Sequence, residues 1–114
     1  MGDEQTPVDL LSTTGTGPVW GMASNDLNAT LLAWPPGHDV AEHTNAELDV
    51  LLVVLEGSGV VTVDREERAL APGHLLLLER GSLRAIRSGP EGLRYLSVHR
   101  RRGPLQVAPM PPQR

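Results

Sequence analysis

The stretch Gly37–Gly57, GHDVAEHTNAELDVLLVVLEG, joins a polar segment directly to an apolar run. In its polar half, groups that can bind a proton, a metal or a ligand stand at every second position: His43, Asn45, Glu47 and Asp49. Its apolar half is the run Val50–Leu55. Because successive side chains of an extended strand point to opposite faces, we expect the four polar groups to converge at the mouth of a hydrophobic strand. This pattern predicts a small β-barrel with a pocket.

The composition limits the classes of protein that the chain can belong to. Its 114 residues, 39% hydrophobic and 21% charged, are enough for one folded domain and too few for two. The net charge of -4 and the 3% of aromatic residues argue against a nucleic-acid partner. The absence of Cys excludes disulfides and thiolate metal sites. No apolar stretch reaches the ~20 residues of a membrane span, and the acidic N-terminus is unlike a signal peptide; we expect a cytoplasmic protein without a membrane partner.

The distribution of glycine, proline and apolar residues predicts an all-β fold. Segments predicted as strands are Pro18–Ala23, Leu27–Trp34, Val50–Leu55, Val60–Val63, His74–Leu78, Leu83–Arg87 and Leu93–His99. Turns are predicted between them, including one at Gly57–Gly59 and one at Ser88–Gly92. Strands spaced about ten residues apart favour a sandwich or barrel, and no segment shows a sustained helical period. We expect Val54, Leu76 and Ile86 to lie in the core.

The chain divides into three parts by composition. Residues 1–17 are predicted to form a flexible N-terminal arm, residues 18–102 the barrel, and the proline-rich residues 103–114 a C-terminal tail. The runs VLLVVL and LLLL would be apolar on both faces, whereas a strand of an antiparallel sheet with one wet face should alternate. A closed interior with adjoining loops would account for this. We favour a homodimer, in which one sheet face meets a second subunit.

From Trp20 to His99 the sequence resembles the cupins, a family of small jelly-roll β-barrels with two antiparallel sheets. The first cupin motif is a glycine, five residues, His-x-His, three or four residues, Glu, six residues and Gly. Gly37, His43 and Gly57 match it, and Asn45 takes the place of the second His. Val50 stands where the motif has Glu, with Asp49 one position earlier.

The second cupin motif is a glycine, five residues, Pro-x-Gly, two residues and His, with an Asn four residues further on. Gly73 and Gly81 match it, whereas Glu79 replaces the proline, Arg84 the histidine and Ser88 the asparagine. The chain is also similar to a group of short single-domain cupins of unassigned function that carry His-x-Asn-x-Glu-x-Asp at residues 43–49. The resemblance implies a jelly roll with the polar residues at its mouth.

These departures decide what the resemblance implies about metals. Metal-dependent cupins typically hold Fe, Mn, Ni, Cu or Zn with three His and one Glu, and only His43 keeps its register here. Arg84 is permanently cationic and cannot coordinate a metal. We therefore expect neither a metal nor another cofactor. The alternative is a divalent transition metal held by His43, Glu47 and His99, although strand parity alone does not say whether His99 points inward.

Three functional classes follow from these residues. In the favoured one, the pocket binds an anionic or carbonyl-bearing small molecule through His43, Asn45, Glu47, Asp49 and Arg84. An ion pair of Arg84 with Glu47 or Asp49 could instead only close the pocket. The second class is an enzyme: an isomerase, epimerase or cyclase in which His43 and Glu47 or Asp49 act as acid and base, or a dioxygenase or lyase if a metal binds. The third is a structural or interaction module.

Overall fold

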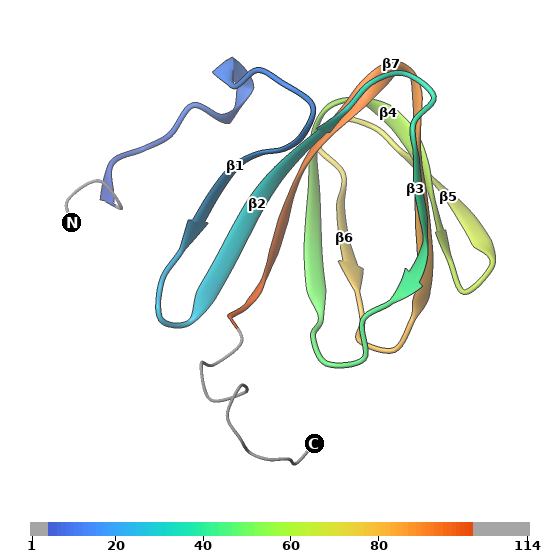
Figure 1. Ribbon diagram of the computed structural model, residues 1–114. Coiled ribbons are helices and arrows are strands. Elements are labelled where there is room, and N and C mark those ends of the chain that lie inside the picture. The colour runs from blue at the N-terminus through green and yellow to red at the C-terminus, as the bar shows by residue number, and fades with distance from the viewer. Residues whose placement is uncertain (1–4, 102–114) are drawn as a thin grey trace.

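The structure, a computed structural model, describes residues 5–101, which form an antiparallel β structure preceded by a short arm (Figure 1). Its strands are β1 (Gly17–Ala23), β2 (Leu27–Trp34), β3 (Asp39–Thr44), β4 (Val50–Val63), β5 (Glu66–Leu70), β6 (Leu75–Leu78) and β7 (Leu83–Arg100). The arm holds a 3-10 turn, η2 (Leu10–Ser12), whose N-terminus is capped by the Asp9 carboxylate. The all-β prediction is confirmed. Within residues 5–101, no helical segment has the length and hydropathy to cross a bilayer.

The two long strands, β4 and β7, run through both layers of the fold. In the first layer the strand order is β1-β2-β7-β4-β6, and in the second it is β3-β7-β4-β5 (Figure 1). This is a jelly roll, as expected. It is not a closed barrel, however. Among the described residues, the strands β1, β3, β5 and β6 each pair with one strand only, so the hydrogen-bonded ladder does not return on itself.

Glycines let β4 and β7 pass from one layer to the other. Sequence reasoning predicts turns at Gly57–Gly59 and Ser88–Gly92, and both predictions are wrong, because each strand bends there without ending. Gly57 and Gly92 have positive φ values of 81° and 82°, which favour glycine. A Cβ on Gly57 would overlap the carbonyl oxygen of Gly92. The close approach of the two backbones at this bend therefore depends on the missing side chain.

The core lies between the two layers. Val54 and Ile86 are 1% and 7% exposed, and Leu76 packs against them as a partly buried side chain, so the predicted core residues are confirmed. The buried cluster consists of Val50, Leu52, Val54, Val61, Leu70, Leu78, Ile86, Leu93 and Tyr95. In β4 its members stand at alternate positions from Val50 to Val54, which is the period of two expected of a strand with one inward face.

The hairpin between β4 and β5 is closed without glycine. Asp64 and Arg65 both have positive φ values, 49° and 73°, as a two-residue hairpin turn requires. Asp64 is fixed from outside the hairpin, because its amide donates to the carbonyl of Leu83 at 2.7 Å and its carboxylate accepts from the amide of Leu83 at 2.8 Å. These contacts to β7 offset the backbone strain that a non-glycine residue meets in this region.

Candidate functional site

The polar segment after β3 is a loop and does not continue the strand. Strand β3 ends at Thr44, and β4 begins only at Val50. The side chain of Asn45 explains the break, since its Oδ1 accepts hydrogen bonds from the amides of Glu47 at 3.0 Å and Leu48 at 3.1 Å. Such side-chain bonds to the backbone favour a turn over a ladder. The expectation that the alternate polar residues share one strand face is therefore wrong.

The loop is fastened to the turn between β6 and β7. The carbonyl of Asn45 accepts from the amide of Gly81 at 2.7 Å, and the carboxylate of Asp49 accepts from the amide of Arg80 at 2.8 Å. Asp49 thus has a structural partner at the rim. Two shallow hollows flank Glu47 here. One has a volume of about 370 Å³ and is lined by residues 43–47, and the other, of about 310 Å³, is lined by Glu47, Leu48, Asp49, Arg80 and Arg100.

Arg84 lies below this rim with its side chain inside the fold. It stands opposite His43 on β3 and opposite Val63 on β4, and it shares the inward side of β7 with the core residue Ile86. Arg84 is only 4% exposed. Its Nη1 atom is buried and, within residues 5–101, has no hydrogen-bond partner. Burial lowers the pKa of Arg84, because desolvation disfavours the charged guanidinium, although an arginine remains a cation in a protein.

The alternative in which an ion pair closes the pocket is not observed. The ion pairs within residues 5–101 are Arg68–Glu66, Arg87–Asp39 and Arg94–Glu56, and none of them involves Arg84. The predicted site residues therefore occupy one end of the molecule without forming one closed cluster. His43 stands near the end of β3, and Asn45, Glu47 and Asp49 belong to the loop that follows. Arg84 lies beneath them and lines neither hollow.

The two histidines named as candidates differ in their surroundings. His43 is exposed, and its Nδ1 lies 2.9 Å from the carbonyl oxygen of Ala41, which leaves Nε2 toward solvent or a ligand. His99 shares the inward side of β7 with Tyr95, so the face that parity alone left open is the inner one. Its Nε2 lies 3.3 Å from the side-chain amide of Asn28, and its Nδ1 lies 2.9 Å from the carbonyl of Arg100. Both ring nitrogens are thus engaged.

Comparison with protein families identifies the chain. Residues 29–103 match the family model of the AraC-like ligand binding domain, and this match spans more than half of the sequence. The chain belongs to this family. It is a ligand-binding domain of the cupin type, which confirms the resemblance found in the sequence. No curated protein matches the sequence.

Solved structures agree with the fold. A double-stranded β-helix protein from Klebsiella pneumoniae is 17% identical, with a TM-score of 0.75 and 88% of each chain covered. A protein from Thermus thermophilus is 29% identical, with a TM-score of 0.66, and the match covers 78% of this chain and 84% of that one. A protein from Bacillus halodurans is 22% identical, with a TM-score of 0.64, and the match covers 69% of this chain but 65% of that one. Cupin domains are also among the matched structures.

The residues of this cupin domain do not fit the metal centre that metal-dependent cupins hold. Arg84 offers no lone pair at the place of a ligand, and the buried Val50 stands at the place of the glutamate. Within residues 5–101, no three His, Asp or Glu side chains gather closely enough to hold an ion. The alternative trio of His43, Glu47 and His99 is therefore not assembled.

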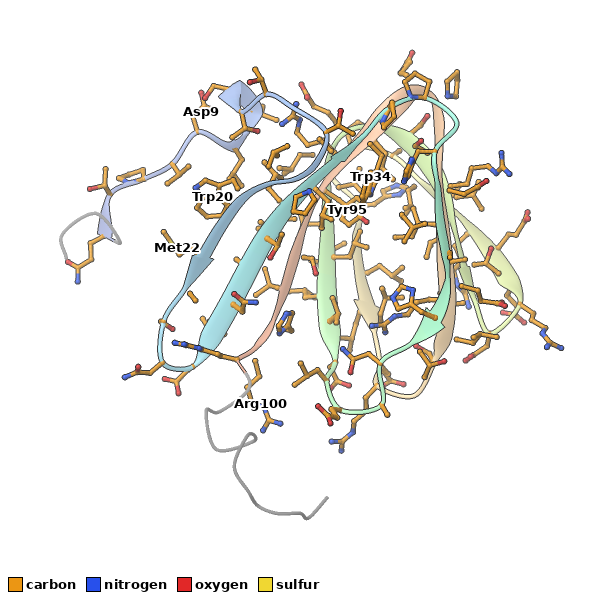
Figure 2. The ribbon with its side chains drawn as sticks, in the orientation of Figure 1. Asp9, Trp20, Met22, Trp34, Tyr95 and Arg100 are labelled. Atoms are coloured by element: carbon orange, nitrogen blue, oxygen red, sulfur yellow. The ribbon has the colours of Figure 1, made fainter. Side chains whose placement is uncertain are left out.

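Sequence reasoning missed a set of contacts at the opposite end of the inner face. His38 is half-buried and stacks on Trp34 with 4.3 Å between ring centroids. Trp34 donates a hydrogen bond to the Tyr95 hydroxyl at 3.1 Å, and Figure 2 shows these two side chains close together. Ser88 is 2% exposed; its hydroxyl bonds the carbonyl of Pro35 and accepts from the amide of His38. Only the place of Ser88 in the second cupin motif pointed to a role, and that role is to fix the β2–β3 connection.

Proposed function

We propose that this cupin domain binds a small carboxylate-bearing molecule through Arg84, without the metal of the metal-dependent cupins. The observation that supports this proposal is the buried Nη1 of Arg84, which lacks a hydrogen-bond partner among the described residues. A buried charged donor without a partner costs several kcal/mol of folding free energy. A ligand carboxylate would supply both the missing acceptor and the opposite charge.

The guanidinium chemistry favours a planar, two-oxygen anion. Arginine presents parallel N–H donors that match a carboxylate at two points, and such charge-assisted bonds are about twice as strong as neutral ones. His43 stands on the neighbouring strand opposite Arg84, with its Nε2 available. It would contact a second polar group of the ligand, such as a carbonyl oxygen. The ligand would thus combine a carboxylate with a carbonyl or hydroxyl group.

Pyruvate, acetate and acetone separate the parts of this proposal. Pyruvate carries a carboxylate and a carbonyl, acetate only the first and acetone only the second. We expect chemical-shift changes in NMR titrations to saturate with pyruvate, to saturate more weakly with acetate, and to be absent with acetone. Arg84→Lys should weaken pyruvate binding about tenfold, because an ammonium does not reproduce the two-point contact. Arg87→Lys is the matched control, since Arg87 is exposed and paired with Asp39.

Two outcomes would overturn the proposal. If Arg84→Lys and Arg87→Lys bind pyruvate equally well, Arg84 is not the anion site. Metal analysis of untagged protein tests the remaining part. If the purified protein carries a stoichiometric transition metal that His43→Ala removes, the metal-free proposal is wrong. A metal-dependent enzyme then becomes the favoured functional class.

A further inference from the structure

A hollow lies on the outer face of the second layer, on the side of the layer opposite the core. Its volume is about 320 Å³, and its floor is formed by Val60, Thr62 and Ala85. These three residues point outward, because they alternate along β4 and β7 with buried residues such as Val61 and Ile86. The hollow therefore has a floor of small, mostly apolar side chains that is separate from the core.

One row of side chains crosses the strands beneath the hollow and ends in a carboxylate. On β4, Thr62 stands opposite Ala85 of β7 and, on its other side, opposite Glu67 of β5. Residues that face each other across antiparallel strands point to the same side of the sheet, so all three side chains lie on the outer face. Glu67 lines the hollow and is exposed. A carboxylate therefore stands at the β5 end of the row.

A bulge places a second carboxylate at the β3 end of the same row. The pairing of β3 with β7 shifts its register between Val40 and His43. As a result, Ala41 and Glu42 both stand opposite the single residue Ala85. Both line the hollow, and Glu42 is exposed. The row thus runs from a carboxylate on one outer strand of the layer to a carboxylate on the other.

The charges of the hollow are negative at its two ends and balanced at its side. Arg87 lines the hollow, and its guanidinium pairs with the carboxylate of Asp39 at 3.1 Å. Neither Glu42 nor Glu67 belongs to an ion pair within residues 5–101. A ligand with a positive charge at each end and an apolar chain between the charges would match both the carboxylates and the floor.

The spacing of the strands sets the length of such a ligand. Glu42 and Glu67 stand on the outer strands of the order β3-β7-β4-β5, so their backbones lie about 14 Å apart at about 4.8 Å for each of the strand spacings between them. Charge-assisted contacts of about 2.8 Å at each end leave about 8–9 Å between two ammonium nitrogens. An extended six-carbon chain with bonds of about 1.5 Å spans about 9 Å between its terminal nitrogens. Carboxylates this far apart do not share one metal ion.

We propose that this hollow binds a linear aliphatic diamine. One ammonium group contacts Glu42, the other contacts Glu67, and the methylene chain lies over Thr62 and Ala85. This site is separate from the one proposed for a carboxylate, because Arg84 points to the opposite side of β7. The two proposals therefore stand or fall independently.

Three probes with the same six-carbon chain separate the parts of this proposal. Hexane-1,6-diamine carries a cation at each end, hexylamine carries one, and hexane-1,6-diol carries none. In NMR titrations of the full chain at low ionic strength, we expect the amide signals of Val60, Thr62 and Ala85 to shift and saturate with the diamine. Hexylamine should bind about fivefold more weakly, because it forms only one of the two ion pairs. The diol should cause no saturable shift.

Substitutions test the carboxylates and the floor separately. Glu42→Gln and Glu67→Gln should each weaken diamine binding about fivefold. Glu66→Gln is the matched control, because it removes the same charge from the neighbour of Glu67, whereas Glu66 pairs with Arg68 and does not line the hollow. Ala85→Leu should prevent binding by filling the floor while both carboxylates remain. Circular dichroism of each variant shows whether it is folded.

Three results would overturn this proposal. If hexylamine binds as tightly as the diamine, the site does not recognise two charges. If Glu66→Gln weakens binding as much as Glu67→Gln, the attraction comes from the general negative charge of the surface. If magnesium chloride shifts the same signals at the same concentrations, the hollow collects cations without regard to the methylene chain.

Discussion

Replacing Arg84 by methionine should make the ligand-free protein more stable. The side chain is 4% exposed, and its buried Nη1 has no partner among the described residues, so folding removes this charged donor from water without a hydrogen bond in exchange. Methionine keeps an unbranched aliphatic stem of similar length and carries no charge. Replacing buried ionic groups by apolar side chains of similar volume is often stabilising by about 1–4 kcal/mol. We therefore expect Arg84→Met to raise the free energy of unfolding by about 1–3 kcal/mol.

Equilibrium unfolding in urea measures this change directly. The midpoint should rise while the slope with denaturant stays constant, which shows that the surface exposed on unfolding is unchanged. The melting temperature should rise by about 4–8 °C for each kcal/mol in a domain of this size. Protein concentration must be equal in both samples, because any self-association would contribute to the measured stability.

Ligand addition distinguishes a binding residue from a structural one. Pyruvate at about a hundred times its dissociation constant should stabilise the wild type by about 2.7 kcal/mol and leave Arg84→Met unchanged. The opposite result would be a fall of more than about 1 kcal/mol in the free energy of unfolding of ligand-free Arg84→Met. In that case Arg84 stabilises the fold, and its buried nitrogen does not destabilise it. That result would refute the reasoning behind the proposed function.

Three further predictions concern the fold. Gly57→Ala should destabilise the protein by several kcal/mol in urea unfolding, because Gly57 has a positive φ and no room for a Cβ, whereas Gly21→Ala, at ordinary contact distances, should have little effect. Val54→Asp should prevent soluble folding, because an unpaired buried carboxylate costs about as much as a domain's whole stability. The control Val53→Asp should fold, because Val53 points away from the core. An unchanged melting point for Val54→Asp would refute the core assignment. Burial raises the pKa of Tyr95 above its ordinary 10.0, and the hydrogen bond from Trp34 opposes this rise in part. The stability that the protonated tyrosine contributes should therefore be complete below pH 10.0 and fall as the pH rises through the pKa of Tyr95 in the folded protein. Tyr95→Phe should abolish this alkaline loss in pH-dependent melting curves.

The sequence is sufficient for the fold because local signals and the apolar pattern agree. The strands β1 and β2 are predicted within one residue of their ends, since a Ser-Asn-Asp turn separates two apolar segments. The bends at Gly57 and Gly92 are predicted as turns, because glycine with a positive φ serves a turn and a bend equally well. Only the pairing of Gly57 with Leu93 across the sheet distinguishes the two, and that pairing is a contact between distant parts of the chain.

The candidate site is predictable in its residues but not in their arrangement. The alternation from His43 to Asp49 predicts a strand, whereas the side chain of Asn45 bonds the backbone and forms a turn. The same sequence spacing would suit an asparagine that continues a strand and an asparagine whose side chain caps a turn, so the sequence does not distinguish the two. The sequence also does not predict that, among the described residues, Arg84 forms no ion pair. The carboxylate of Asp49 instead accepts a hydrogen bond from a backbone amide of the β6–β7 turn, which is a contact between distant parts of the chain.

A single residue at one position of β7 decides which charge the interior of this cupin domain favours. Two unit charges about 4 Å apart interact by about 4 kcal/mol at an effective dielectric constant near 20, so a divalent ion beside Arg84 would face about twice that energy as repulsion. A carboxylate at the same distance would gain about 4 kcal/mol of attraction. Three histidines and a glutamate in this place would reverse both signs, since they supply lone pairs and a negative charge. Family membership therefore carries over the fold, whereas the proposed preference for a carboxylate ligand rests on the guanidinium of Arg84.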